Sequence, residues 1–313
     1  MADRPHAHPQ SSIHARSQDR IRAQPQDRVH ARSQDRIDAH QHFWRYGPRT
    51  HAWIDDSMAV LKRDFLPADL EPLLQTNGFD GCVAVQAQQD VAETAWLLAL
   101  AEEHGFIRGV VGWVDLLSPD VERQLDQFAQ HPKLRGVRHI VQSEPDGFMA
   151  RDHFRRGIAA LERWSLTYDI LIYERQIPDA VDLVRAFPRQ PFVIDHIAKP
   201  DIKSHTTGAT SIDAWRAGMQ ALARHENVYC KLSGMVTEAD WHNWSPADFA
   251  PYIEVVLEAF TPERCMIGSD WPVCTLAGSY GSVTGLVLGY IARLSPGEQV
   301  AVRGGSAMKA YGI

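Results

Sequence analysis

Two histidines one position apart, His40 and His42, end the apolar stretch of sequence that begins at Ile37. Alternate side chains of an extended strand point to the same side, so we expect the two imidazoles to converge. Converging imidazoles can share a metal ion, or they can polarise a carbonyl group and hold a water molecule. His196 and Asp270 follow two later apolar stretches. The pattern therefore predicts that four reactive side chains meet at the ends of separate strands.

Positioning these residues requires a regular frame, and from Ile37 onward short β-branched stretches alternate with helical ones. Helices are predicted, for example, from Pro67 to Asn77, with Gly78 as the stop signal, and from a Ser118 N-cap to about residue 131. The strand stretches are near-continuous apolar runs, as in parallel sheets that are covered by helices. The predicted strands span residues 37–42, 81–86, 109–115, 134–139, 167–173, 192–196, 228–232 and 265–268.

Eight strand–helix units fit a (β/α)8 barrel, which typically needs about 250 residues. An open doubly wound sheet would carry a glycine-rich loop after its first strand, where this sequence has His40-Gln41-His42. We therefore predict one barrel over residues 37–313. Reactive groups in such barrels gather at the C-terminal ends of the strands. Side chains at the predicted strand ends are His40, His42, Gln86, Trp113, Asp115, Arg138, His139, Tyr173, His196, Lys231, Ser233 and Asp270.

Residues 1–36 differ from the rest of the sequence. They contain three near-copies of an eight-residue unit, at residues 13–20, 21–28 and 29–36, rich in Arg, Gln and Asp. Such polar repeats bury too little apolar surface to offset the entropy of ordering. We predict a disordered, low-complexity tail that precedes the barrel.

Composition excludes several classes of function. The 313 residues carry a formal net charge of -7, so no basic field for nucleic acid is expected. No apolar run reaches the roughly 18 residues of a membrane helix, and the start of the sequence does not resemble a secretory signal. The four cysteines are scattered and form no CxxC pair, which favours buried thiols in a reducing cytoplasm.

Taken in order, the motifs DAHQHFW, GVRH, DHIAKP, KLSG and GSDWP resemble the amidohydrolase superfamily. More narrowly, they resemble its amidohydrolase-related (type 2) branch of sugar-lactone hydrolases. The resemblance covers about residues 36–313 and implies that His40, His42, His196 and Asp270 form the working set.

The resemblance leaves the metal open. Metal-dependent members usually carry a histidine at the fifth strand, where this sequence has Tyr173, and two-metal members carry a bridging lysine or glutamate at the fourth, where it has Arg138. A two-metal site is therefore not expected. Either one divalent ion, with zinc the first choice, is held by His40, His42 and Asp270, with or without His196, or Arg138 and His196 act as the electrophile and no metal is required.

The expected reaction is hydrolysis of a sugar-acid lactone in carbohydrate breakdown, with a small-molecule lactone as partner. Asp270 would activate water while the three histidines polarise the carbonyl. No GxSxG motif is present, which disfavours an acyl-enzyme. The loop at residues 43–64 and the segment 142–148 are expected to line the mouth. Predicted substrate-binding residues are Arg138, Gln86, Trp113, Tyr173, Lys199 and Trp271, with Trp44 as a further apolar wall.

Two alternatives remain at this point. The first is a metal-dependent decarboxylase or hydrolase of an aromatic or muconate-type acid on the same barrel. The second is a non-catalytic binding module, a role that (β/α)8 proteins seldom have.

Overall fold

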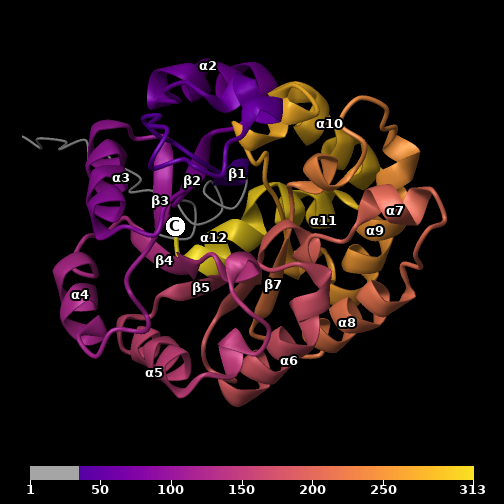
Figure 1. The fold of residues 1–313 in the computed structure, drawn as a ribbon. Coiled ribbons are helices and arrows are strands. Elements are labelled where there is room, and N and C mark those ends of the chain that lie inside the picture. Colours follow the sequence, from indigo (N-terminus) through magenta and orange to yellow (C-terminus); the bar gives the residue numbers. More distant parts are fainter. Residues whose placement is uncertain (1–34) are drawn as a thin grey trace, which may run out of the picture.

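A computed structural model describes residues 35–313 and places them in a (β/α)8 barrel, as predicted (Figure 1). Eight parallel strands follow one another around the ring, each paired with the next, and the helices lie outside them. All but the last two residues of the predicted tail lie outside the described residues. The strands are β1 Ile37–Gln41, β2 Gly81–Val85, β3 Ile107–Gly112, β4 Leu134–His139, β5 Thr167–Ile170, β6 Phe192–Ile194, β7 Val228–Leu232 and β8 Cys265–Ile267.

The strands are buried along almost their whole length, because one face looks into the barrel and the other meets the helices. A large apolar cluster fills the space between strands and helices. A smaller one closes the barrel from below, where Ala307 and Tyr311 pack with Ile37, Val83 and Val111. All four cysteines are buried free thiols, as predicted.

Strands β8 and β1 meet at a seam that closes the ring. The seam has one isolated bridge, Gln41 to Trp271. Two backbone hydrogen bonds reinforce it: the Asp270 N–H donates to the His40 carbonyl at 2.8 Å, and the His42 N–H donates to the Trp271 carbonyl at 2.7 Å. The seam therefore brings the His-x-His stretch beside the aspartate that follows β8.

The helices largely follow the sequence prediction. Gly78 ends α2 in the left-handed region, with φ 72°. The prediction of Ser118 as a helix N-cap is wrong. Its hydroxyl accepts the Asp120 N–H within a turn, and α4 begins only at Val121. The α-helices are α2 Pro67–Asn77, α3 Val91–Glu103, α4 Val121–Phe128, α5 Asp152–Leu161, α6 Ile177–Ala186, α7 Ile202–Thr206, α8 Asp213–Ala223, α9 Pro246–Phe260, α10 Tyr280–Ile291, α11 Pro296–Val300 and α12 Ser306–Tyr311. Among the described residues, no helix combines the length and apolarity that crossing a bilayer requires.

Three strands end two or three residues earlier than predicted, and the first of them, β3, ends at Gly112 rather than Asp115. Strand β5 ends at Ile170 rather than Tyr173, and β6 ends at Ile194 rather than His196. After β6 the backbone turns sharply, because four consecutive non-glycine residues from His196 to Lys199 have positive φ values of 52°, 50°, 59° and 45°. Runs of this kind cost energy and are found where the surrounding structure enforces them, often at functional sites.

Candidate active site

The seam places three predicted site residues side by side. The Nε2 atoms of His40 and His42 lie 3.1 Å apart. Oδ1 of Asp270 lies 3.4 Å from His42 Nε2 and 3.9 Å from His40 Nε2. Asp270 itself is in the left-handed region, with φ 56°, so its carboxylate points back over the strand ends. One carboxylate oxygen thus faces two imidazoles.

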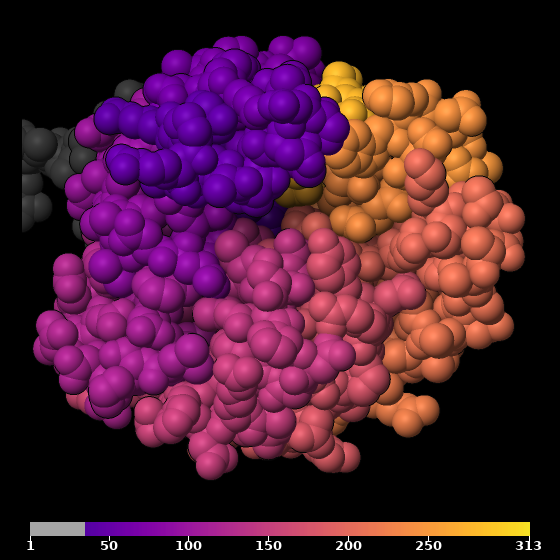
Figure 2. All heavy atoms as spheres, viewed as in Figure 1, coloured from indigo at the N-terminus to yellow at the C-terminus, as the bar shows by residue number. Residues whose placement is uncertain are grey.

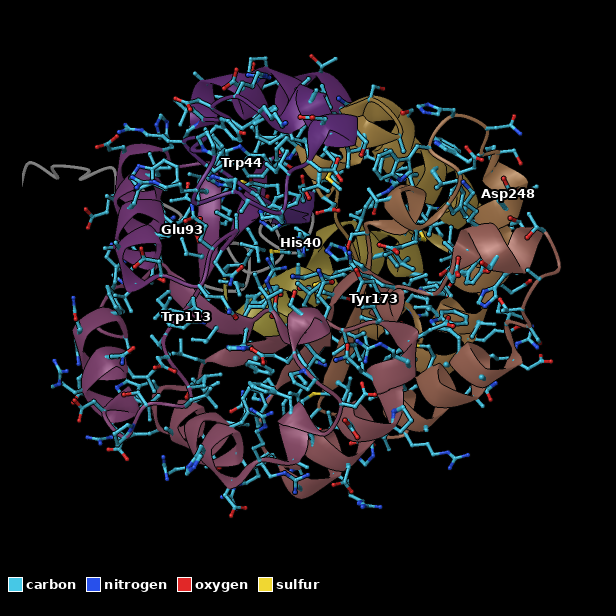
Figure 3. The ribbon with its side chains drawn as sticks, viewed as in Figure 1. His40, Trp44, Glu93, Trp113, Tyr173 and Asp248 are labelled. Atoms are coloured by element: carbon cyan, nitrogen blue, oxygen red, sulfur yellow. The ribbon has the colours of Figure 1, made fainter. Side chains whose placement is uncertain are left out.

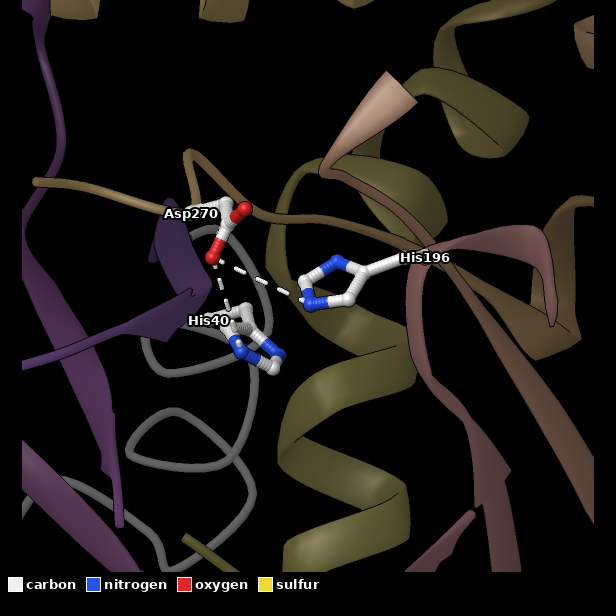
Figure 4. A group of neighbouring side chains, drawn as sticks. All are labelled: His40, His196 and Asp270. Atoms are coloured by element: carbon white, nitrogen blue, oxygen red, sulfur yellow. Dashed lines mark ion pairs between the residues drawn. The ribbon is translucent and has the colours of Figure 1, made fainter. Parts of the chain in front are cut away.

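His196, which follows β6, approaches the same oxygen from another direction than His40 (Figure 4). Its Nε2 lies 3.8 Å from Asp270 Oδ1, and its Nδ1 lies 2.9 Å from the Ser233 hydroxyl. Gly234 makes room for the ring: a Cβ there would lie 2.4 Å from His196 Nδ1, and the residue has φ 62°. The KLSG and DHIAKP motifs therefore act together, since the glycine of one accommodates the histidine of the other.

The protonation states of the site follow from burial and hydrogen bonding. His42 Nδ1 lies 2.8 Å from the Val85 carbonyl, which can only accept, so Nδ1 carries hydrogen and Nε2 of the neutral ring offers its lone pair. Burial lowers the pKa of His196 to about 4 and that of His40 well below its ordinary value. Burial acts to raise the pKa of Asp270, but His196 and His42 outweigh it and hold that pKa below its ordinary value. At neutral pH the carboxylate of Asp270 therefore lies beside the uncharged imidazoles of His40 and His196.

Arg138, at the end of β4, borders the same space. Its Nη1 donates to Asp195 Oδ2 at 2.9 Å, and its Nη2 donates to Gln86 Oε1 at 2.9 Å. These contacts fix the guanidinium beside His40 Nε2, at 3.3 Å. The guanidinium is therefore a positive group held in a fixed position at the site.

A cavity of about 200 Å³ opens above these side chains. Its floor is polar, with His42, His196, Asp270 and Arg138, and Lys199 stands at its side. The space-filling view shows a hollow on this face, between the indigo residues and the pink and orange ones (Figure 2). The remaining wall is largely apolar and consists of Trp44, Trp53, Ala87, Ile140, Gln142, Ser143, Leu171 and Val273.

The predicted mouth segments do contribute, since Trp53 comes from the loop at residues 43–64 and Gln142 from the segment 142–148. Sequence reasoning missed Ile140, Leu171 and Val273, which are ordinary apolar residues with no distinguishing signal.

The predicted substrate-binding residues divide into two groups. Arg138 and Lys199 line the cavity, whereas the other four lie outside its lining. The Trp113 backbone N–H is bound by Thr94, and Trp271 packs against Phe43 and Phe65. Gln86 supports Arg138, and Tyr173 is 38% exposed with the Lys199 ammonium 5.6 Å from its ring centre. Figure 3 shows Tyr173 and Trp113 relative to His40.

Three of these side chains could hold a metal ion. His40, His196 and Asp270 each offer one ligand atom, and these atoms lie within 4.8 Å of one another. Imidazole nitrogens with a carboxylate oxygen form a donor set that suits zinc and similar divalent ions. The predicted set was His40, His42 and Asp270, with His196 as a further candidate, so this group differs from it in lacking His42. The donor chemistry fits one divalent ion.

A barrel with His-x-His at its closing seam, a histidine after β6 and an aspartate after β8 belongs to the amidohydrolase type of hydrolase fold. The chain is a member of the amidohydrolase family, whose match spans residues 37–313, as the motifs predicted.

Its similarity to individual relatives is high along most of the chain. It is 42% identical over 283 residues to the L-fucono-1,5-lactonase of Burkholderia multivorans, covering 88% of this chain and 95% of that protein. It is 38% identical over 282 residues to the L-fucono-1,5-lactonase of Burkholderia ambifaria, covering 88% and 95%. A solved amidohydrolase from Burkholderia multivorans with bound zinc superimposes with a TM-score of 0.86 at 40% identity, covering 89% of this chain and 99% of that one.

Proposed function

We propose that this chain hydrolyses a sugar-acid lactone and that L-fucono-1,5-lactone is the first substrate to test. One observation carries the proposal: a carboxylate oxygen of Asp270 faces His42 at 3.4 Å and His196 at 3.8 Å in the lining of a small cavity. A volume of about 200 Å³ is below the usual range of ligand pockets and suits a single sugar ring. The two L-fucono-1,5-lactonases at 42% and 38% identity support the same substrate class.

Asp270 is the general base of the proposed reaction. Its carboxylate takes a proton from a water molecule as the water oxygen bonds to the lactone carbonyl carbon. The guanidinium of Arg138 and the Nε2 side of His196 face the cavity, where negative charge develops on the carbonyl oxygen. The ring C–O bond then breaks, and Asp270 returns the proton to the leaving oxygen. The product is an open-chain hydroxy acid.

A divalent ion, with zinc our choice, would be held by His40, His196 and Asp270 and would polarise the lactone carbonyl. The zinc bound in the similar Burkholderia multivorans structure supports that choice. His42 is left to orient the attacking water through its Nε2 lone pair.

A panel of aldonolactones, followed by acid release with a pH indicator, tests the proposal. We expect L-fucono-1,5-lactone to be opened far faster than in buffer alone, and zinc-loaded and chelator-treated protein should be compared. Rates no greater than the buffer background on every lactone would overturn it. Carbon dioxide release from an aromatic acid would instead support the decarboxylase alternative.

A further inference from the structure

A layer of buried charged groups lies directly beneath the site. Lys231, the last residue but one of β7, is completely buried. Its Nζ lies 2.6 Å from Asp169 Oδ2, 2.9 Å from Asp195 Oδ1 and 3.1 Å from His40 Nδ1. The ammonium donates to Asp169 and faces His40 Nδ1, and Asp195 Oδ1 is its second charge partner. Lys231 is therefore the centre of a network that ends on a site histidine.

Tyr311 of α12 completes the layer from below. Its hydroxyl lies 2.8 Å from Asp169 Oδ2 and 3.0 Å from Oδ1, so it donates to this carboxylate. The Thr167 hydroxyl, on β5, donates to the Ala310 carbonyl at 2.7 Å and fixes the same helix. Asp169 is thus held between a tyrosine and a lysine, and the position of the ammonium is set from outside the site.

Two groups compete for Nδ1 of His40: the Lys231 ammonium, which can only donate, at 3.1 Å, and Asp195 Oδ1, which can only accept, at 3.2 Å. We infer that the ammonium prevails, so that Nδ1 accepts and the hydrogen of the ring lies on Nε2. The hydrogen on His40 Nε2 is accepted by His42 Nε2 at 3.1 Å, since the hydrogen of His42 is on Nδ1 and is donated to the Val85 carbonyl. Arg138 Nη1 lies farther from this atom, at 3.3 Å, and Asp195 engages it at 2.9 Å. This arrangement is the metal-free form, because an ion on Nε2 would require the hydrogen on Nδ1.

We propose that Lys231 is a positioning residue, which fixes the orientation and tautomer of His40 and is itself held in place by Asp169 and Tyr311. None of the three lines the cavity, so they act on the reaction only through His40 and Asp195. Displacement of a site group by about 1 Å can cost about 100-fold in rate. The layer thus contributes to catalysis without meeting the substrate.

The first test is spectroscopic and does not depend on the proposed function. Chelator-treated protein with nitrogen-15 histidine is studied by long-range proton–nitrogen NMR, and His40 is assigned by comparison with His40→Gln. We expect the hydrogen of His40 on Nε2 in the wild type and on Nδ1, facing Asp195, in the charge-balanced variant Lys231→Met/Asp169→Asn. Hydrogen on Nδ1 in the wild type would overturn the proposal.

The second test is kinetic and rests on the proposed lactone hydrolysis. Removing Lys231 alone leaves two buried carboxylates unbalanced and endangers folding. The charge-balanced Lys231→Met/Asp169→Asn variant avoids this, and we expect kcat to fall about 100-fold with KM within about threefold. Tyr311→Phe should lower kcat by about three- to tenfold, because only the hydrogen bond that holds Asp169 is removed.

A matched control separates positioning from loss of a buried tyrosine hydroxyl. Tyr252 is also buried, and its hydroxyl lies 2.8 Å from His205 Nδ1, outside the network. Tyr252→Phe should leave kcat unchanged. Folded Lys231→Met/Asp169→Asn protein with wild-type kcat would contradict the positioning role, whereas an inactive wild type would contradict only the proposed function.

Discussion

Two layers of buried polar groups occupy the barrel interior, and they are organised differently. The upper layer, with His42, His196 and Asp270, borders the cavity, and its contacts to the shared carboxylate are 3.4 Å and 3.8 Å long. In the lower layer, Lys231 and Tyr311 meet the Asp169 carboxylate at 2.6 Å and 2.8 Å. Groups with spare hydrogen-bonding capacity are free to meet a substrate, whereas fully paired buried charges fix geometry. The difference predicts that substitutions in the upper layer lower the rate directly, whereas substitutions in the lower layer act on the rate by displacing His40.

The largest expected effect is in the upper layer. Asp270→Asn removes the general base but keeps the shape of the side chain, so kcat should fall about 1,000-fold while the melting temperature changes little. Initial rates on the best lactone, with thermal unfolding, measure both. Asp248→Asn is the matched control, because Asp248 caps α9 far from the site (Figure 3) and should affect only stability. A folded Asp270→Asn protein with wild-type kcat would remove Asp270 from the mechanism.

The pH dependence of the rate tests the protonation state of His196 in the upper layer. Burial lowers the pKa of His196 to about 4, so this ring is uncharged at higher pH and gains a proton only as pH falls through about 4. We expect kcat to be flat from pH 7 down to about 5 and then to fall about tenfold per unit below the pKa. A pH–rate profile on freshly diluted enzyme measures this. An acidic limb centred near 6.5 would show that the ring is solvated like an ordinary histidine.

Glu93, on α3, is a buried carboxylate that belongs to neither layer. Burial raises its pKa to about 7, and its Oε2 accepts the N–H groups of Ala87 and Gln88. Between pH 4.5 and 7 the native state holds a proton that the unfolded state has released, so stability falls as pH rises through this window. Glu93→Gln lacks this penalty.

The variant should therefore gain stability relative to wild type between pH 5 and pH 8, by up to about 3 kcal/mol. Urea unfolding at the two pH values measures the difference. An equal difference in unfolding free energy between variant and wild type at pH 5 and pH 8 would show that Glu93 titrates normally.

The smallest expected effect is at the cavity wall. Trp53 is 44% exposed, and its ring meets Trp44 edge-on at 6.1 Å. Trp53→Ala removes only part of the apolar surface against the sugar ring, so KM should rise about three- to tenfold with kcat nearly unchanged. Saturation kinetics separate the two parameters. A fall in kcat with constant KM would instead assign Trp53 to the upper layer.

Much of this arrangement could be predicted from sequence, because strands buried on both faces leave continuous apolar runs. The barrel rule then placed His40, His42, His196 and Asp270 at neighbouring strand ends. The left-handed run after β6 could not be predicted, since it depends on the space that Gly234 leaves for His196. Nor could the sequence show which tryptophans border the cavity, because the residue type is the same for a tryptophan in the core and for one that lines the cavity.

The lower layer could not be predicted from the sequence for a second reason. Lys231 stands as a single cation inside an apolar run, and no local pattern indicates whether such a residue points inward. Its partners Asp169 and Tyr311 are 62 and more residues distant. Only the closed barrel reveals the pairing.

The seam between the first and last strands ties activity to the completion of folding. The His-x-His stretch and Asp270 are 228 or more residues apart in sequence and become neighbours only when β8 docks on β1. Such distant contacts form late, because closing a long loop must precede any gain from the contact. A partly assembled barrel in which β8 has not docked would therefore be inactive. The recovery of catalytic activity during refolding would report when the barrel closes.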